Sequence, residues 1–541
     1  DEDNKLKYNF MVAPGEFILV SDGKGGVMRQ VGTSFSAPLV SGTAALIHGA
    51  WPWWKGHGEE TVDVILQSAT DLGKEGVDSV YGWGMLNVEA ALSPLSWDNL
   101  QFYYAKSANG RLKKGKSASW MRRAYLKSDV VKLENKGAYV VAIETVGDTY
   151  RDFRIPLSTQ LFGEVSVVDQ IDQQRKFQRH MYQRFVDWAT SGSSFGDVQS
   201  FQSDLGLNGD WSLAMNAAPY APGTDVREGD LPFQTDLSLR QRTTGAEIRF
   251  GHGDGAARLN SSSVFGFYSD FDVQTGGVNP IFGLASGGAY ASSAIPLSDR
   301  LTLEASVTEA SDDHSYIDPL TDVRLYGANG LSEYEAQAAN IAVDYQLTDN
   351  VSVSLDYTQL RERDSLLGDQ GTGLFSLEGG AVTDAVTVGS DIALPFDFAI
   401  GASATLGQTD ATEFDGGFLS IADGGLTSSA FAVGIRKNGI FGDNDIMRMS
   451  LAQPLRLETG EFVFTSIEVV DRETGELGQV SQNWGLADTG RRLNLELSYG
   501  AALFDGMGEI SAFTRADVTE TEARNPLDPD YAVGARFAIR Y

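Results

Sequence analysis

The chain has 541 residues, enough for about two to four domains, and its 42 Lys and Arg against 73 Asp and Glu give a formal net charge of −31. This acidic balance argues against a nucleic-acid-binding protein and suits a secreted or cell-surface one. Cysteine is absent, which excludes disulfides and thiolate metal sites, and the sequence predicts no cofactor and no bound metal.

The chain also contains no run of about 18 apolar residues, so a transmembrane helix is not predicted. A membrane β-barrel would escape this test, because its strands alternate apolar and polar residues. The sequence begins Asp1-Glu2-Asp3 without Met, and we expect processing or truncation before this point.

Residues 1–97 have the pattern of the end of an α/β domain. An apolar strand is predicted over 17–20, followed by a Gly-rich turn over 22–26 and a helix from about Ser34. Two further helices are predicted over 59–67 and 87–92.

Residues 98–200 are predicted to be a linker region with one strand over 138–144. From Ile171 to Trp188 the apolar residues recur at helical spacing, with basic residues among them. We expect a helix there, either on the surface of a small linking domain or associated with the region that follows.

From residue 201 to the end the apolar period changes to two, which is typical of strands. Hairpins are predicted around turns at 296–299, 348–350, 395–397 and 503–508. These short turns alternate with long Gly- and Asp-rich loops near 310–337, 361–381, 408–428 and 470–490. Outer-membrane barrels have this asymmetry, and the chain ends on an aromatic residue, Tyr541. The sequence therefore predicts a large antiparallel up-and-down β-barrel, with a soluble β-sandwich as the alternative.

Ser34 is the candidate catalytic residue. A serine hydroxyl becomes a nucleophile only when a base accepts its proton, and the attack needs donors for the oxyanion that forms. Gly32 and Thr33 allow close approach of a substrate, and a helix N-terminus at Ser34 offers backbone N–H groups. Taken alone, the same residues also fit an ordinary helix cap.

Three segments around this serine resemble, in order and spacing, the last third of a subtilase catalytic domain. The segments are Phe10-Met11-Val12-Ala13-Pro14-Gly15, Gly32-Thr33-Ser34-Phe35-Ser36-Ala37-Pro38-Leu39-Val40-Ser41-Gly42, and Tyr81-Gly82-Trp83-Gly84-Met85-Leu86-Asn87-Val88-Glu89-Ala90-Ala91. The resemblance implies that Ser34 is the nucleophile, that its own N–H belongs to the oxyanion hole and that Pro14-Gly15 supports the site. Phe35 and Leu39 depart from the commonest family residues, Met and His.

In the subtilase order the triad Asp and His precede Ser, and none of the five His residues lies before Ser34. His48 and His57 are interpreted as surface or helix-end residues, and His180, His252 and His314 lie far downstream. We therefore expect this chain to be an inactive fragment of an active parent peptidase, because triad members act as a unit.

A subtilase segment joined to a membrane-type barrel resembles a serine-protease autotransporter of Gram-negative bacteria, in which a helix before the barrel threads its pore. The resemblance implies a serine endopeptidase with a polypeptide substrate, anchored or exported by a barrel in contact with outer-membrane lipid, and located at the outer membrane, at the cell surface or outside the cell. The predicted domains are the C-terminal part of a peptidase domain over 1–97, a linker region over 98–200 and a β-barrel over 201–541. The alternatives are a porin-like barrel with a vestigial protease remnant and a secreted subtilase with a soluble β-rich region.

Overall fold

A computed structural model describes most of the chain. The described residues are 5–105, 112–113, 126–127, 139–156, 199–205, 210–219, 233–253, 255–259, 278–312, 316–317, 324–325, 331–414, 418–442, 445–486, 491, 493–504, 508–518 and 531–539. The predicted helix over 171–188, His180 and His314 lie outside them. The chain forms two compact units, the first made of residues 1–124, 135–162 and 464–482, and the second of the remainder.

The N-terminal part of the first unit contains the predicted strand and the three predicted helices, and it adds a second strand and three short 3-10 helices. Its elements are η1 (Lys5–Asn9), β1 (Ile18–Ser21), β2 (Val27–Gln30), α1 (Thr33–Ala50), η2 (Pro52–Gly56), α2 (Gly58–Gln67), α3 (Val88–Ala91) and η3 (Trp97–Asn99). The Gly-rich turn joins β1 to β2, and the Asp22 carboxylate accepts hydrogen bonds from the N–H groups of Lys24 and Gly26 at 2.7 and 2.8 Å. An acidic residue at the start of a turn therefore orders this loop.

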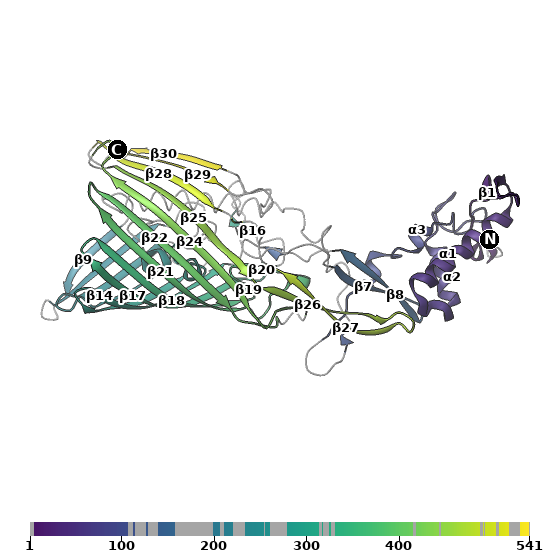
Figure 1. The fold of residues 1–541 in the computed structure, drawn as a ribbon, viewed down its shortest axis with the longest axis horizontal. Coiled ribbons are helices and arrows are strands. Elements are labelled where there is room, and N and C mark those ends of the chain that lie inside the picture. Colours follow the sequence, from purple (N-terminus) through teal and green to yellow (C-terminus); the bar gives the residue numbers. More distant parts are fainter. Residues whose placement is uncertain are drawn as a thin grey trace. The chain divides into compact units, whose positions relative to one another are not determined.

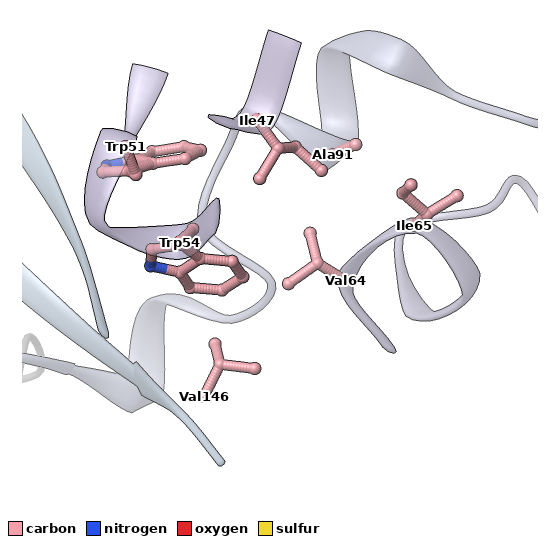
Figure 2. Close-up of a cluster of buried hydrophobic side chains, with 7 residues drawn as sticks. All are labelled: Ile47, Trp51, Trp54, Val64, Ile65, Ala91 and Val146. Atoms are coloured by element: carbon pink, nitrogen blue, oxygen red, sulfur yellow. The ribbon is translucent and has the colours of Figure 1, made fainter. Parts of the chain in front are cut away.

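The core of the first unit lies where the C-terminal end of α1 meets η2 and α2. Figure 2 shows its seven side chains, which are Ile47, Trp51, Trp54, Val64, Ile65, Ala91 and Val146. Ile47, Trp54, Val64 and Ala91 have no exposed surface. Because Val146 belongs to a later hairpin, the core joins the helices to a strand that follows them in sequence.

That hairpin consists of β7 (Tyr139–Val146) and β8 (Thr149–Pro156), and β7 also pairs with the short strand β3 (Leu100–Gln101). The structure confirms the strand predicted over 138–144 and adds β8. The hairpin accepts hydrogen bonds from three indole N–H groups: those of Trp53 and Trp54 bond the Tyr150 carbonyl at 3.0 and 2.6 Å, and that of Trp51 bonds the Asp152 carboxylate at 3.0 Å.

A second hairpin in the first unit comes from the C-terminal part of the chain. It is formed by β26 (Glu461–Asp471) and β27 (Glu476–Gly485), of which residues Phe464–Gln482 belong to this unit. The sequence predicts only a long loop near 470–490, since nothing in its local pattern indicates a contact with the N-terminal helices.

The second unit is built on a 15-stranded antiparallel sheet, counted over the residues that the structure describes. In sheet order its strands are β9 (Gln199–Leu205), β10 (Trp211–Pro219), β11 (Phe233–Gln241), β12 (Glu247–His252), β13 (Ala289–Ser298), β14 (Leu301–Asp312), β17 (Tyr334–Thr348), β18 (Val351–Arg363), β21 (Val382–Leu394), β22 (Phe398–Thr409), β24 (Leu426–Asn438), β25 (Asp445–Thr459), β28 (Asn494–Leu503), β29 (Gly508–Asp517) and β30 (Tyr531–Ile539). Neighbours in the sheet follow one another along the chain, and Figure 1 shows the sheet curving so that some strands lie behind others. The predicted fold class, a partial α/β segment followed by a large antiparallel up-and-down sheet, is confirmed.

The hairpins predicted around the turns at 348–350 and 395–397 are both present. Val343 pairs with Leu355 across β17 and β18, and Leu394 pairs with Phe398 across β21 and β22. The second turn is tight because Phe396 and Asp397 both adopt positive φ, at 63° and 58°. Mirror-image turns of this kind match the twist of the flanking strands.

The two faces of the sheet have the opposite polarity to those of a soluble protein, in which apolar side chains are buried and polar ones are exposed. Its exposed face carries large apolar side chains, which include Leu303, Val307, Ile341, Val343, Leu355, Val386, Val388, Leu406, Val433, Met449, Leu495, Leu497, Val533 and Phe537. Its other face carries buried polar side chains, which include Ser306, Thr308, Asn340, Asp356, Thr358, Thr383, Thr387, Ser403, Thr405 and Thr409. Cross-strand hydroxyl pairs satisfy some of these, as between Thr387 and Thr405 at 2.8 Å.

The polar face encloses part of the connection between β12 and β13. There the short helix α7 (Pro280–Gly283) contacts β17, β18, β22 and β25, strands that are spread over six consecutive positions in the sheet order. The Asn279 side chain caps α7 and donates to Thr358 Oγ1 at 3.0 Å, and the Tyr334 hydroxyl donates to the Leu284 carbonyl at 2.8 Å. The sheet therefore wraps around this segment.

Short elements occupy the predicted long loops. They are β15 (Tyr316–Ile317), β16 (Arg324–Leu325), β19 (Ser365–Leu366), β20 (Asp369–Gly371), η5 (Gly373–Phe375) and β23 (Leu419–Ile421). Among the described residues, none of the helices has both the length and the apolar character needed to cross a membrane.

Candidate active site

Ser34 is the second residue of α1 and its side chain is exposed. The residue that caps the helix is Gly32, whose φ of 152° and ψ of 149° lie in a region that only glycine adopts readily. The structure thus excludes the alternative in which Ser34 is itself the helix cap. Gly32 gives the chain its sharp entry into the helix, which leaves the Ser34 hydroxyl on the surface.

The first turn of α1 presents backbone N–H groups beside Ser34, of which the Phe35 N–H donates to the Gly32 carbonyl at 3.0 Å. Gly32 offers no side-chain hydrogen bond to it, and the first N–H groups of an α-helix have no partner within the helix. The helix dipole adds partial positive charge at the same end. An oxyanion that forms beside Ser34 would meet these backbone donors.

The segment around Pro14-Gly15 supports this turn directly. The Gly15 carbonyl accepts the Gly32 N–H at 2.8 Å, and the Ser36 hydroxyl donates to the carbonyls of Ala13 and Pro14 at 3.0 and 3.1 Å. A Cβ at position 15 would lie 2.6 Å from Ser36 Oγ and 3.1 Å from the Gly32 carbonyl oxygen, so a side chain there would push the two segments apart.

The third segment packs against the first. The Trp83 N–H donates to the Phe10 carbonyl at 3.1 Å, the Val12 N–H to the Gly84 carbonyl at 2.9 Å and the Leu86 N–H to the Val12 carbonyl at 2.8 Å. A Cβ at Gly82 would lie 2.1 Å from the Phe10 carbonyl oxygen. Three segments that are separate in sequence are thus joined in one structure, with residues 10–15 between the other two.

The histidines of the first unit lie away from Ser34. His48 is in the last turn of α1, 14 residues after Ser34, which separates the two by about 21 Å along the helix axis. Its Nε2 lies 2.9 Å from Thr61 Oγ1 and so links α1 to α2. His57 precedes α2, and its Nδ1 lies 3.7 Å from Glu60 Oε2. Both are helix-end residues, as predicted, and neither is positioned to accept the Ser34 proton.

The structure also places residues to which the sequence assigns no role. Asn87 lies in the third segment, and its side chain caps α3 by accepting the Ala90 N–H at 2.9 Å. His252 ends β12 in the second unit. Three tryptophans at positions 51, 53 and 54 stand out in the sequence. They lie where later hairpins pack onto the end of α1.

Comparison with known proteins identifies the family of the N-terminal segment. Residues 10–84 match the subtilase family model. Over 66 residues the chain is 47% identical to the Neisserial autotransporter lipoprotein NalP of Neisseria meningitidis serogroup B, which is 12% of this chain and 6% of that protein. Over 68 residues it is 37% identical to an extracellular serine protease of Serratia marcescens, which is 13% of this chain and 6% of that protein. The matches span only about a fifteenth of these relatives.

The solved structures that resemble the chain align with it more extensively but at low similarity. An anion-selective porin from Comamonas acidovorans covers 59% of this chain and 78% of its own, with 10% identity and a TM-score of 0.31. The outer membrane protein OmpT of Vibrio cholerae covers 63% of this chain and 94% of its own, with 12% identity and a TM-score of 0.31. Residues 10–84 are therefore a subtilase segment, and the chain joins this segment to a large antiparallel β-sheet.

Proposed function

We propose that the chain is part of a subtilisin-like serine endopeptidase in which Ser34 is the nucleophile and residues 201–541 form an outer-membrane β-barrel. In this proposal residues 1–97 belong to the peptidase domain and residues 98–200 connect it to the barrel. The peptidase assignment rests on the hydrogen bond between Gly32 and Gly15, which holds the exposed Ser34 at the N-terminus of α1, where no side chain caps the helix.

The chemistry assigned to this chain is the acylation step of peptide hydrolysis. Ser34 Oγ attacks the scissile carbonyl carbon as its proton passes to a histidine general base, which the rest of the parent protein supplies. The carbonyl oxygen takes up negative charge and receives hydrogen bonds from N–H groups in the first turn of α1. As the tetrahedral intermediate collapses, the C–N bond breaks, the histidine gives its proton to the leaving nitrogen, the amine departs and the acyl group stays on Ser34.

The surface around α1 supports a larger peptidase domain. This 18-residue helix has few polar residues, yet only Thr43 and Ile47 are buried. Leu46 is 52% exposed, and Leu19 and Val27 on the neighbouring hairpin are 63% and 73% exposed. A helix that is apolar on most sides normally lies inside a domain, and large exposed apolar patches mark interaction surfaces. The remainder of a subtilase domain would cover this surface.

The test of the peptidase assignment is Ser34→Ala in the full-length parent protein. We expect the loss of both peptide hydrolysis and labelling by a serine-directed fluorophosphonate, with the fold unchanged. Ser41→Ala is the matched control, because Ser41 lies in the same helix and its exposed hydroxyl donates only to the Ala37 carbonyl at 3.3 Å. Turnover near the wild-type rate in Ser34→Ala would overturn the assignment.

The 541-residue chain provides a second test. Among the described residues His48 and His57 are engaged at helix ends, so in this proposal neither serves Ser34 as a base, and we expect no fluorophosphonate labelling above that of a heat-denatured sample. Strong labelling would assign one of these histidines to the site.

The membrane assignment rests on the inverted faces of the sheet. Exposed Leu, Val, Ile and Phe side chains on one face and buried Thr, Ser, Asn and Asp side chains on the other are what lipid outside and a polar interior require. In this proposal the protein lies in the outer membrane and its peptidase part acts on polypeptide substrates. Purification of residues 201–541 as a monomer without detergent would instead favour a secreted subtilase with a soluble β-rich region.

A further inference from the structure

Within the first unit, the hairpin Phe464–Gln482 contacts the N-terminal part of the chain through Arg472, which is half exposed. Arg472 Nη1 donates to the Asp152 carboxylate at 2.8 Å, and Nη2 donates to the same carboxylate at 3.2 Å and to the Ala50 carbonyl at 2.6 Å. Its guanidinium also lies 5.0 Å from the centre of the Trp53 ring. One side chain thus binds β8, the end of α1 and the tryptophan cluster together.

The turn of the same hairpin fits closely against Trp53. A Cβ at Gly475 would lie 2.9 Å from the Trp53 ring, which leaves no room for a side chain. The φ of this glycine is 76°, a backbone conformation that other residues rarely adopt. The Tyr150 hydroxyl donates to the Gly475 carbonyl, and the Tyr150 ring lies 5.9 Å from that of Trp53. Lys55 adds an exposed ion pair with Glu473 at 3.8 Å.

The strands of the hairpin make further contacts. The Tyr139 hydroxyl donates to the Glu468 carboxylate at 3.4 Å, and the Gln482 amide donates to the Tyr139 carbonyl at 3.1 Å. The Ile467 N–H donates to the Tyr103 carbonyl at 3.3 Å. The partners in these hydrogen bonds are at least 320 residues apart in the sequence, so the contacts do not follow from local connection.

From these contacts we infer that Phe464–Gln482 is a latch that holds residues 5–105 and 139–156 to the C-terminal part of the chain without need of the covalent connection through residues 157–198. Charge-assisted hydrogen bonds, a fitted glycine turn and an aromatic contact act together on one surface, which is the composition of an interface hot spot. A cut between the two parts would therefore leave them associated, and the peptidase part would stay at the membrane.

The latch also leaves the candidate active site free. It binds at Ala50 and Trp53, whereas Ser34 is at the other end of α1, an 18-residue helix about 27 Å long. Retention and catalysis are therefore separate properties, and the latch does not depend on Ser34 being the nucleophile.

The test uses the 541-residue chain in detergent, with a recognition site for an added protease inserted within residues 163–198 and an affinity tag at the N-terminus. After cleavage, capture of the N-terminal fragment should bring down most of the C-terminal fragment. Arg472→Ala should speed dissociation at least about tenfold, and Tyr150→Phe, which removes only a hydroxyl, about two- to tenfold.

Glu476→Ala is the matched control, because it removes an exposed side chain from the same hairpin and should leave co-capture unchanged. Separation of the wild-type fragments on cleavage would overturn the latch, as would equal retention in Arg472→Ala and Glu476→Ala. If uncut Arg472→Ala does not fold, Tyr150→Phe decides, since it keeps the aromatic packing against Trp53.

Discussion

The guanidinium of Arg151 and the carboxylate of Glu144 form an ion pair whose side chains are 0% and 1% exposed. The two residues are paired across β7 and β8. Arg151 Nη1 also donates to the Ala91 carbonyl at 2.7 Å, and Glu144 Oε1 accepts the Leu95 N–H at 2.8 Å. This buried pair therefore joins the hairpin to the chain at Ala91 and Leu95, at the end of α3 and just after it.

Removal of one partner of the pair should lower the stability of the fold, because the other charge would stay buried without an opposite charge beside it. We expect Arg151→Met to lower the free energy of unfolding by about 3–5 kcal/mol. Trp51 and Trp54 report on this change, since their rings lie 5.1 and 5.8 Å from the Arg151 guanidinium. The measurement is urea unfolding followed by tryptophan fluorescence.

Arg154→Ala is the control for that variant, because Arg154 lies on the same strand and is exposed. Its contact is with the Tyr139 ring at 4.8 Å, and the expected loss is about 0.5–1 kcal/mol. Similar losses in the two variants would show that the buried pair does not stabilise the hairpin.

Gly32 and Gly42 should respond in opposite ways to alanine. Gly32→Ala places a side chain on a backbone with φ of 152°, which should cost about 1–3 kcal/mol and fray the start of α1. Gly42 is inside the helix, and a Cβ there would meet nothing within 4 Å, so Gly42→Ala should stabilise α1 by about 0.5–1 kcal/mol. Hydrogen exchange of α1 peptides measures both, and equal protection in the two variants would contradict the role assigned to Gly32.

The sequence predicts the parts of this molecule that depend on local order. Apolar residues at every second position predict the hairpins around Asp349 and Phe396. Apolar residues at helical spacing predict α1, with Ser34 near its start. It could not predict the latch, because Arg472 and Asp152 meet over 320 residues and neither residue departs from an ordinary surface pattern. Arg151 likewise lies in a strand of mixed polarity, and only the packing of Trp51 and Trp54 around it explains its burial.

Leu355 and Ser354 test the assignment of the two faces of the sheet. Leu355 is 52% exposed on the apolar face, whereas Ser354 is on the polar face and pairs with Asp344 on β17. Leu355→Arg near the middle of the membrane should cost about 2–4 kcal/mol and impair assembly. Ser354→Arg places the same charge beside an acidic residue in the interior and should be tolerated. The readout is the amount of protein in the outer membrane, and equal tolerance would favour a soluble sheet.

The last described strand, β30, tests whether the sheet closes. It pairs with β29 along one edge, and β9 is at the opposite end of the strand order. An open edge cannot persist in hydrocarbon, because its N–H and C=O groups find no water there. Deletion of residues 531–541 should therefore abolish insertion, whereas a soluble sandwich that loses an edge strand would only be weakened.

A disulfide can locate the closing pair, since the natural chain has no cysteine to compete. Ser203→Cys on β9, combined in turn with single cysteines from Tyr531 to Ile539 on β30, should form a cross-link only at the position that brings the two Cα atoms within about 7 Å. The cross-link should be intramolecular, so it should appear as a monomer with altered mobility on a non-reducing gel. Cross-linked dimers alone, or normal outer-membrane levels of the chain without residues 531–541, would mean that β9 and β30 do not close one barrel.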